Sequence, residues 1–245
     1  MRLRTALRRL ALRYTGYDIH KHDAERDVDY WADMAEILSE RGSVTAFDVG
    51  ANQGQTLSTL VEVFANVSIH AFEPSPSIFS QLSEAFARNK DVTLNNCGVG
   101  CQKSEMELME NTHSTMTSFL ELGPQGWGEI VQRIKVPVTT IDDYSAERGI
   151  EHINLLKIDT QGFDFEVIKG AKRMLTETRI DLVLTEITFA QLYKGLPPFD
   201  VIYAHMAERG YHLTGVYNQH REGRILDWAD VMFASPSILR ERVGQ

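Results

Sequence analysis

The stretch Phe47–Thr56, FDVGANQGQT, combines a short apolar strand, a turn with two glycines and the start of a helix. Gly50 and Gly54 lie four residues apart, whereas the dinucleotide fingerprint G-x-G-x-x-G places a second glycine where the backbone touches a pyrophosphate. Asn52 stands near that position, so we expect this turn to hydrogen-bond a smaller polar ligand. The alternative is a plain tight turn, in which Gly50 supplies an unusual φ and Asn52 caps the helix.

Strands and helices alternate on both sides of this turn. Short apolar strands are predicted at 43–50, 67–74, 91–100, 153–160, 180–187, 211–218 and 229–235. Helices with one apolar face are predicted at 28–41, 55–65, 164–175 and 199–210. Ser75 followed by Pro76 marks the start of one more helix. This rhythm predicts an α/β fold with a doubly wound, Rossmann-like parallel sheet.

Residues 101–145 interrupt the rhythm. Two extra strands, 104–110 and 133–144, are predicted around a polar loop, and we interpret this segment as a small β insertion. No composition shift indicates a second domain. We therefore expect an N-terminal helical extension at 1–42 and one domain at 43–245.

Charge and cysteine usage exclude several function classes. The 245-residue chain has a net charge of −9, and its first 17 residues hold five arginines and no acid, so the remainder carries −14. A body this acidic argues against a general nucleic-acid binder, because phosphate would be repelled. Cys97 and Cys101 lack the further ligands of a zinc site, and their usage suits a reducing cytoplasm. No apolar run approaches the roughly 20 residues of a membrane-spanning helix.

The basic start of the chain needs its own explanation. In residues 1–17, Leu3, Leu7, Leu10 and Tyr14 recur at helical spacing between arginines. The pattern is typical of an interfacial helix that is attracted to anionic headgroups. An amphipathic helix that packs on its own domain, a partly frayed terminus and a transit peptide are the alternatives. A peripheral membrane contact through residues 1–17 is therefore one expectation among several.

Polar residues follow the predicted strands where an open parallel sheet binds its ligands, outside the carboxyl ends near the topological switch point. They are Asp48–Gly54, Glu73, Asn96–Val99, Asp159–Gly162 and Glu186. Glu73 lies 19 residues after Gly54, where an acid typically accepts hydrogen bonds from ribose hydroxyls. A ribose site without a cradled pyrophosphate fits S-adenosylmethionine better than NAD or ATP.

Five segments together resemble one family, the FkbM family of S-adenosylmethionine-dependent methyltransferases. They are FDVGANQGQT (47–56), AFEPSPSIFSQL (71–82), VPVTTIDDY (136–144), LLKIDTQGFDFEVIKGA (155–171) and LVLTEI (182–187). Each motif alone is generic to class I methyltransferases, whereas their combination is specific, and the match runs from about residue 44 to 235. The resemblance implies a seven-stranded sheet whose last strand is antiparallel. It also implies methyl transfer to a hydroxyl, commonly on a sugar or a glycosylated natural product.

The resemblance also assigns site residues. Asp48, Gly50, Asn52 and Gly54 fall on the cofactor loop, Glu73 on the ribose position, and Asn96, Cys97 and Gly98 on the region that flanks adenine. Asp159, Gln161 and Gly162 fall on the motif that faces the sulfonium and the acceptor. Many members have Val-Glu where this chain has Thr160-Gln161, and Glu in place of Asp164. The chain therefore lacks one glutamate that is a candidate metal ligand or base.

Methyl transfer to oxygen needs an aligned acceptor and a base that takes the hydroxyl proton. Asp159 is our first candidate for this base, and its alternative role is to hold the methionine ammonium or cap the next helix. His113 is the second candidate, because its unperturbed pKa near 6.5 allows it to accept a proton at neutral pH. Glu186 is a candidate for binding the acceptor.

Other groups at these strand ends carry weaker expectations. Asp159 and Glu186 resemble half of an oxygen-rich magnesium site, but no third ligand stands out, so Mg²⁺ is not favoured and no metal residue is assigned. Asp142 and Asp143 are interpreted as helix caps. Three aromatic residues are candidates for stacking on a sugar ring or for plain packing: Trp127, Tyr193 and Trp228.

We therefore predict a cytoplasmic S-adenosylmethionine-dependent O-methyltransferase whose acceptor is a carbohydrate or glycolipid hydroxyl. The first alternative is an NAD-dependent dehydrogenase or epimerase, which shares the strand–turn–helix start and the ribose acid. The second is a non-catalytic module that binds a nucleoside cofactor. Both alternatives would keep the same sheet, so the sequence separates them only through the missing fingerprint glycine.

Overall fold

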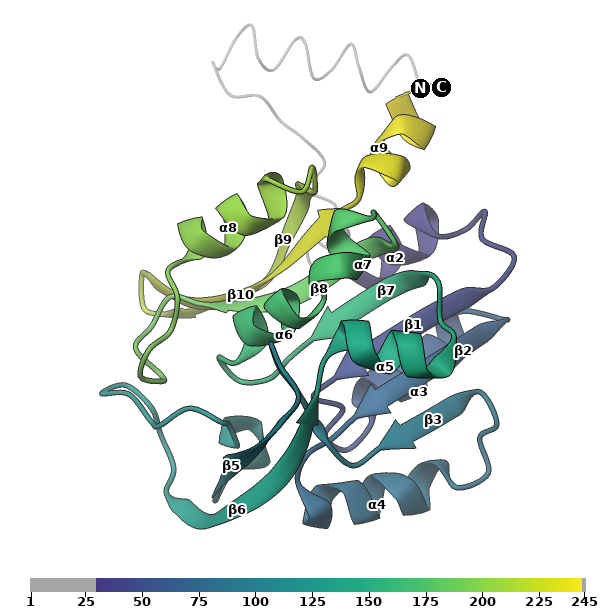
Figure 1. Ribbon diagram of the computed structural model, residues 1–245. Helices are drawn as coiled ribbons and strands as arrows, with labels where there is room; N and C mark the ends of the chain where they lie inside the picture. The colour runs from purple at the N-terminus through teal and green to yellow at the C-terminus, as the bar shows by residue number, and fades with distance from the viewer. Residues whose placement is uncertain (1–29, 244–245) are drawn as a thin grey trace, which may run out of the picture.

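A seven-stranded sheet forms the centre of the computed structural model, which describes residues 30–243 (Figure 1). Its strands stand in the order β3-β2-β1-β7-β8-β10-β9. Their bounds are β1 Val44–Val49, β2 Val67–Phe72, β3 Val92–Asn95, β7 Ile153–Ile158, β8 Ile180–Thr188, β9 His212–Glu222 and β10 Ile225–Ala234. All neighbouring pairs are parallel except those of β10, which is antiparallel to β8 and to β9. The expected doubly wound sheet with its last strand antiparallel is confirmed.

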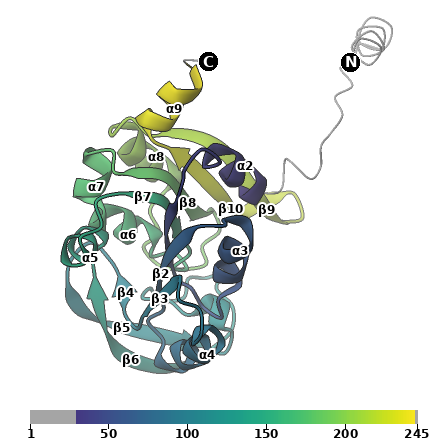
Figure 2. The same ribbon diagram turned by 90° about the vertical axis from the view of Figure 1, so that its right-hand side faces the viewer.

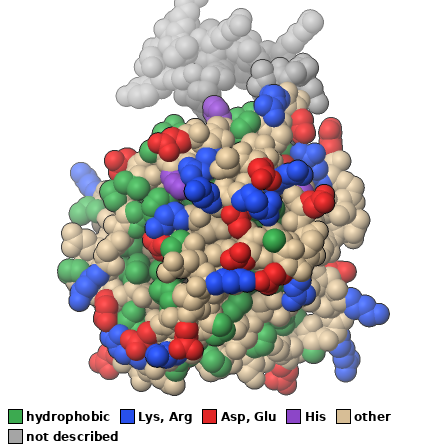
Figure 3. Space-filling view, viewed as in Figure 1, with side chains coloured by type: hydrophobic (Ala, Val, Ile, Leu, Met, Phe, Trp, Pro, Cys, Tyr) green, Lys and Arg blue, Asp and Glu red, His purple; other side chains and the backbone are tan. Residues whose placement is uncertain are grey.

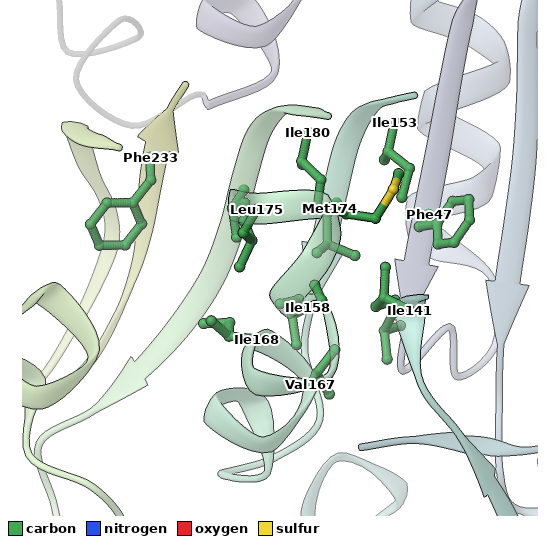
Figure 4. Packing of buried hydrophobic residues seen from close by; sticks show 14 of the residues in the cluster. Phe47, Ile141, Ile153, Ile158, Val167, Ile168, Met174, Leu175, Ile180 and Phe233 are labelled. Atoms are coloured by element: carbon green, nitrogen blue, oxygen red, sulfur yellow. The ribbon is translucent and has the colours of Figure 1, made fainter. Parts of the chain in front are cut away.

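Helices cover both faces of this sheet (Figure 2). On one face lie α2 (Tyr30–Ile37) and α3 (Gln55–Val63), and on the other lie α5 (Ile141–Arg148), α6 (Asp164–Gly170), α7 (Lys172–Thr176) and α8 (Phe199–Ala207). Further helices are α4 (Pro76–Phe86) and α9 (Pro236–Val243). Each face buries its own apolar cluster against the strands. Figure 4 shows one of them, in which Phe47 of β1, Ile158 of β7 and Met174 of α7 pack together.

The predicted insertion forms a second, three-stranded sheet in the order β4-β6-β5. Its elements are β4 (Gly98–Val99), β5 (Ser104–Asn111), the short 3₁₀ helix η1 (Ser114–Met116) and β6 (Ile130–Thr139). The strand predicted at 133–144 is wrong in its second part, because the chain becomes helical at Ile141. Thr140 caps that helix by accepting a hydrogen bond from the backbone N–H of Asp143 at 2.9 Å.

Two predicted elements are each divided in the structure. The strand predicted at 91–100 separates into β3, in the main sheet, and β4, which pairs with β6. The helix predicted at 164–175 separates into α6 and α7. Asp142 caps the new helix start, since its carboxylate accepts from the backbone N–H groups of Arg173 and Met174 at 2.6 and 3.1 Å. Asp142 is therefore a cap, but for a helix about 30 residues further along the chain.

A close contact and a helix cap explain where α3 and α4 begin. Gly54 precedes α3 with a φ of 88°, and a Cβ there would lie 2.4 Å from the ring of Phe86 in α4. Ser75 accepts a hydrogen bond from the backbone N–H of Ile78, and Pro76 occupies the first turn, as the sequence predicts. The displaced glycine thus allows two helices to approach each other, which is a structural role.

Helix α2 packs on the same body as the rest of the chain. Met34 of α2 is 0 % exposed, and Leu38, which follows the end of the helix, is 1 % exposed. Both belong to the apolar cluster that includes residues of β1. The predicted basic helix at 1–17 lies outside the described residues. Among helices of residues 30–243, none is both long and apolar enough to cross a membrane.

Candidate cofactor and catalytic site

A cavity of about 240 Å³ lies at the carboxyl ends of β1, β2 and β7. The main sheet contributes the turns after these three strands, and the insertion contributes Ser114, Thr115 and residues 117–119. Tyr30 of α2 closes one side. The cavity is therefore shared between the sheet, the insertion and α2, at the edge where open α/β sheets bind ligands.

Gly50 allows the turns after β1 and β7 to touch. Its φ is 87°, and a Cβ at this position would lie 1.9 Å from the backbone oxygen of Asp159. Only glycine fits so close an approach. The opening motif therefore brings the backbone against a second loop of the site, and this contact fixes the floor of the cavity.

Asn52 does not cap α3, because Gly54 is the residue at the N-cap and no side chain bonds there. It adopts a left-handed φ of 46°. Its Nδ2 lies 3.5 Å from the hydroxyl of Ser114, across the cavity. Its Oδ1 is buried and accepts no hydrogen bond from any described residue. An orphaned acceptor in a cavity wall costs free energy unless a ligand or water donates to it.

Glu73 stands opposite Asn52 and ties the turns after β1 and β2 together. Its Oε2 accepts from the backbone N–H of Asn52 at 2.9 Å, and its Oε1 accepts from that of Ser75 at 2.8 Å. The residue is only 5 % exposed, and burial raises the pKa of Glu73 to about 7. Each oxygen keeps a second lone pair for a donor in the cavity.

Lys157 lies behind the cavity between two carboxylates. Its Nζ is 3.5 Å from Oδ1 of Asp48 and 3.4 Å from Oδ2 of Asp159. Burial opposes the charged form of Lys157, but Asp159 and Asp48 outweigh it and hold the pKa of this ammonium above its usual value. Asp48 is fully buried, and neither of its oxygens accepts a hydrogen bond from the described residues. Burial raises the pKa of Asp48, and Lys157 is the counter-charge that opposes this rise.

Asp159 is held from its other side by an amide. Gln161 donates from Nε2 to Oδ1 of Asp159 at 2.7 Å, and its Oε1 accepts from the hydroxyl of Tyr193 at 3.0 Å. Ser118 donates to the backbone oxygen of Gln161 at 2.7 Å. This bond holds the backbone of Gln161, which has a left-handed φ of 54°. Since the Asp159 side chain remains 40 % exposed, a held and accessible carboxylate faces the cavity.

Further acids surround Asp159 and make the region negative. Burial, followed by the charges of Asp159 and Asp164, raises the pKa of Glu186 well above its usual value. Burial also raises the pKa of Asp164 to about 6 and that of Asp230 above its usual range. Within residues 30–243, Lys157 is the cation that acts on Glu186 and Asp230, so the region favours a cationic ligand over an anionic one.

The sequence-predicted residues divide into two groups. Seven line the cavity: Gly50, Asn52, Glu73, Cys97, Gly98, Asp159 and Gln161. Asp48 and Gly54 lie behind it, and Asn96 bonds the backbone oxygen of Glu73 at 2.8 Å from outside. The ring of His113 is exposed and packs on Trp127, with ring centres 4.8 Å apart. Glu186 faces a smaller hollow beside Asp164. Trp228 stacks on His220, which fits the packing interpretation.

Several lining residues were missed by sequence reasoning. Lys157 had a visible signal, because it is the one charged residue in the apolar strand INLLKI. Tyr30 and the hydroxyl residues of the insertion had none, since only the fold brings them to the cavity. Within residues 30–243, no three His, Cys, Asp or Glu side chains are placed to hold a metal ion.

Comparisons with known proteins identify the family of this chain. The model of the methyltransferase FkbM domain matches residues 48–213. The 2-O-methyltransferase NoeI of Sinorhizobium fredii is 25 % identical over 176 residues, which cover 67 % of this chain and 72 % of that protein. The 31-O-demethyl-FK506 methyltransferase FkbM of Streptomyces tacrolimicus is 28 % identical over 152 residues. That match covers 51 % of this chain and only 58 % of the relative.

A solved structure gives the same fold. The methyltransferase FkbM of Methylobacillus flagellatus superposes with a TM-score of 0.53 at 16 % identity. The match covers 83 % of this chain and 49 % of that one, so the chain spans about half of this larger neighbour. At this identity the likeness concerns the fold alone.

Proposed function

The chain belongs to the FkbM family of S-adenosylmethionine-dependent methyltransferases, and we propose that it transfers a methyl group to a hydroxyl of a sugar-bearing acceptor. The acceptor class includes glycolipids, polysaccharides and glycosylated natural products. Two relatives carry names that describe methyl transfer to oxygen. The assignment of the acceptor as a sugar rests on the family resemblance and on the need for a base near the acceptor hydroxyl.

The fit of the donor to the cavity rests on three features. The paired carboxylate of Glu73 keeps free lone pairs for the ribose hydroxyls. The buried Oδ1 of Asn52 has no hydrogen-bond partner among the described residues and can accept a hydrogen bond from an ammonium or hydroxyl group of the ligand. The acids around Asp159 favour a cation. The position of Glu73 carries the donor assignment. It lies at the end of β2, where an acid in this kind of sheet accepts hydrogen bonds from ribose hydroxyls.

The bound donor supplies an electrophilic methyl group on a sulfonium. We assign the base to Asp159, whose two oxygens are oriented by Lys157 and Gln161. The acceptor oxygen forms its bond to the methyl carbon as the carbon–sulfur bond breaks, and that electron pair stays on sulfur. The hydroxyl proton passes to Asp159. His113 and Glu186 are not assigned this step, because neither lines the cavity.

Calorimetry separates this function from a nicotinamide-dependent one. The purified chain is titrated with S-adenosylhomocysteine and, separately, with NAD. We expect one equivalent of S-adenosylhomocysteine to bind at least about 100-fold more tightly than NAD. The reason is that Asn52 occupies the place where a pyrophosphate would need bare backbone. Tighter binding of NAD would overturn the donor assignment.

The same titration has a predicted pH dependence. The pKa of Glu73 is about 7 in the free protein, and ribose hydroxyls donate best to its ionised form. Affinity for S-adenosylhomocysteine should therefore rise with pH, and be about tenfold weaker at pH 6 than at pH 8. Because Asp164 also titrates near this range, Glu73→Gln is the control. The Glu73→Gln variant should bind S-adenosylhomocysteine more weakly than the wild type at pH 8, and its affinity should no longer change with pH. If the affinity of this variant still rises with pH, Glu73 is not the cause.

A further inference from the structure

Tyr193 belongs to the loop between β8 and α8, but its side chain lies inside the protein. In Figure 3, hydrophobic side chains gather on the left of the molecule, where Figure 1 shows α8 and the loop before it. Tyr193 is only 3 % exposed, and its hydroxyl bonds Gln161 of the site. It does not line the cavity that Asp159 lines. Any role of Tyr193 in catalysis must therefore act through another residue.

Three contacts hold the Tyr193 side chain in place. Its backbone pairs with Leu122 of the insertion in an antiparallel bridge. Gly162, in the turn after β7, has a φ of 89°, and a Cβ there would lie 2.9 Å from Cδ2 of Tyr193. The Tyr193 hydroxyl also lies 3.3 Å from the sulfur of Met116 in η1. The ring is therefore fixed between the turn after β7 and the insertion.

The Tyr193 hydroxyl determines which way the amide of Gln161 points. An ionised carboxylate only accepts hydrogen bonds, so Gln161 must turn its NH₂ group toward Asp159. Nε2 donates to Oδ1 of Asp159 at 2.7 Å, and Oε1 accepts from the Tyr193 hydroxyl at 3.0 Å. Ser118 holds only the backbone of Gln161. The bond from Tyr193 therefore fixes the side-chain amide, which the backbone bond leaves free to rotate.

Tyr193 acts in this network as a hydrogen-bond donor that keeps its proton. Burial raises the pKa of the Tyr193 hydroxyl, and nearby carboxylates, Glu186 first, raise it further. The phenol is therefore protonated at neutral pH. The amide of Gln161 is neither an acid nor a base in this range, so no proton passes from Tyr193 to Asp159. The link between these two residues is one of orientation.

We propose that Tyr193 is a positioning residue for Asp159 in methyl transfer. Its hydroxyl fixes the amide of Gln161, and this amide holds the Asp159 carboxylate in the orientation that takes the proton of the acceptor hydroxyl. Asp159 needs such support, because its side chain is 40 % exposed and a general base acts only when it is held within reach of that proton. The inference deepens the proposed function and rests on it.

Tyr193→Phe tests this role, because it removes the hydroxyl and keeps the ring that packs on Gly162. The full chain is assayed by transfer of labelled methyl to p-nitrophenyl rhamnoside at saturating S-adenosylmethionine. We expect the turnover number to fall by about 10- to 100-fold, the scale of loss for a misplaced catalytic group. The KM for the rhamnoside, and the affinity for S-adenosylhomocysteine measured by calorimetry, should change by less than about twofold.

Gln161→Met is a second variant, which breaks the same link from its other end. It should lower turnover at least as much as Tyr193→Phe does. Adding Tyr193→Phe to Gln161→Met should then change turnover by less than about twofold, since Tyr193 acts only through the amide. If the double variant instead loses the full effect of Tyr193→Phe once more, the two residues act independently and the proposal is overturned.

Tyr211→Phe is the matched control. Tyr211 is 2 % exposed, its hydroxyl donates to the backbone oxygen of Ile180 at 2.7 Å, and neither residue lines the cavity. Both Phe variants should lower the melting temperature by about 2–4 °C, but Tyr211→Phe should keep normal turnover.

Two results would overturn the positioning role: normal turnover in Tyr193→Phe, or an equal loss of turnover in Tyr211→Phe. The first would show that the Tyr193 hydroxyl is not needed, and the second that any lost buried hydroxyl has this effect. If the wild type transfers no methyl group to the rhamnoside or to a p-nitrophenyl glucuronide, the proposed function itself fails.

Discussion

The substitution Asp159→Asn is expected to lower the turnover number for methyl transfer by about 10²–10⁴-fold, the usual contribution of a general base. Asparagine keeps an oxygen for the amide of Gln161 but cannot take a proton from a hydroxyl. The affinity for S-adenosylhomocysteine should change by less than about tenfold, because we assign donor binding to Glu73 and Asn52, at the other end of the cavity. The measurement is transfer of labelled methyl to a p-nitrophenyl glycoside at saturating donor.

Asp143→Asn provides the control for this prediction. Asp143 is an exposed residue in the first turn of α5, so the same chemical change there should leave turnover unchanged. If Asp159→Asn keeps normal turnover, Asp159 is not the base. If it loses donor affinity while turnover at saturation is kept, Asp159 instead holds the methionine ammonium, which is its alternative role.

The substitution Lys157→Met is expected to lower the free energy of unfolding by about 3–5 kcal/mol at pH 8, as is usual when one partner of a buried ion pair is removed. Lys157 is 3.5 Å from Asp48, and these side chains are 9 % and 0 % exposed. Methionine fills the space but leaves Asp48 without a counter-charge. Burial already raises the pKa of Asp48, so the loss should be smaller at pH 5, where a neutral carboxyl is more readily formed.

An exposed lysine gives the comparison for this stability prediction. Lys135 lies 3.5 Å from Glu105, and the two side chains are 75 % and 64 % exposed. Lys135→Met should therefore change stability by about 0.5 kcal/mol at most. Adding Asp48→Asn to Lys157→Met should recover part of the loss, because it removes the unpaired charge. Equal effects of the two lysine substitutions in denaturant titrations would contradict the buried pair.

Local patterns were sufficient for much of the fold. The alternation of apolar strands and amphipathic helices predicts the parallel sheet, and the Ser75-Pro76 pair predicts the start of α4, which is confirmed. These features depend on residues that are neighbours in the chain. The antiparallel last strand came from the family resemblance, because strand direction depends on where a hairpin returns to the sheet.

Contacts between distant residues account for what the sequence did not reveal. Gly54 lies in the turn that is predicted to be the cofactor loop, and it also makes room for Phe86 in another helix. Asn52 bonds Glu73 through its backbone and leaves its side chain for the cavity. The division of the helix at 164–175 depends on a cap from Asp142. No local pattern contains such information, since each partner lies 21 to 32 residues away.

Transfer of labelled methyl by the wild-type chain tests the proposed O-methylation of a sugar most directly. The protein is incubated with methyl-labelled S-adenosylmethionine and with a neutral and an anionic p-nitrophenyl glycoside, a rhamnoside and a glucuronide, and the products are analysed by mass spectrometry. We expect one added methyl group in an alkali-stable ether on the sugar ring, with one S-adenosylhomocysteine formed for each methyl group transferred. Binding of S-adenosylhomocysteine without label in any glycoside, or label on nitrogen or carbon instead of oxygen, would contradict the proposed O-methylation.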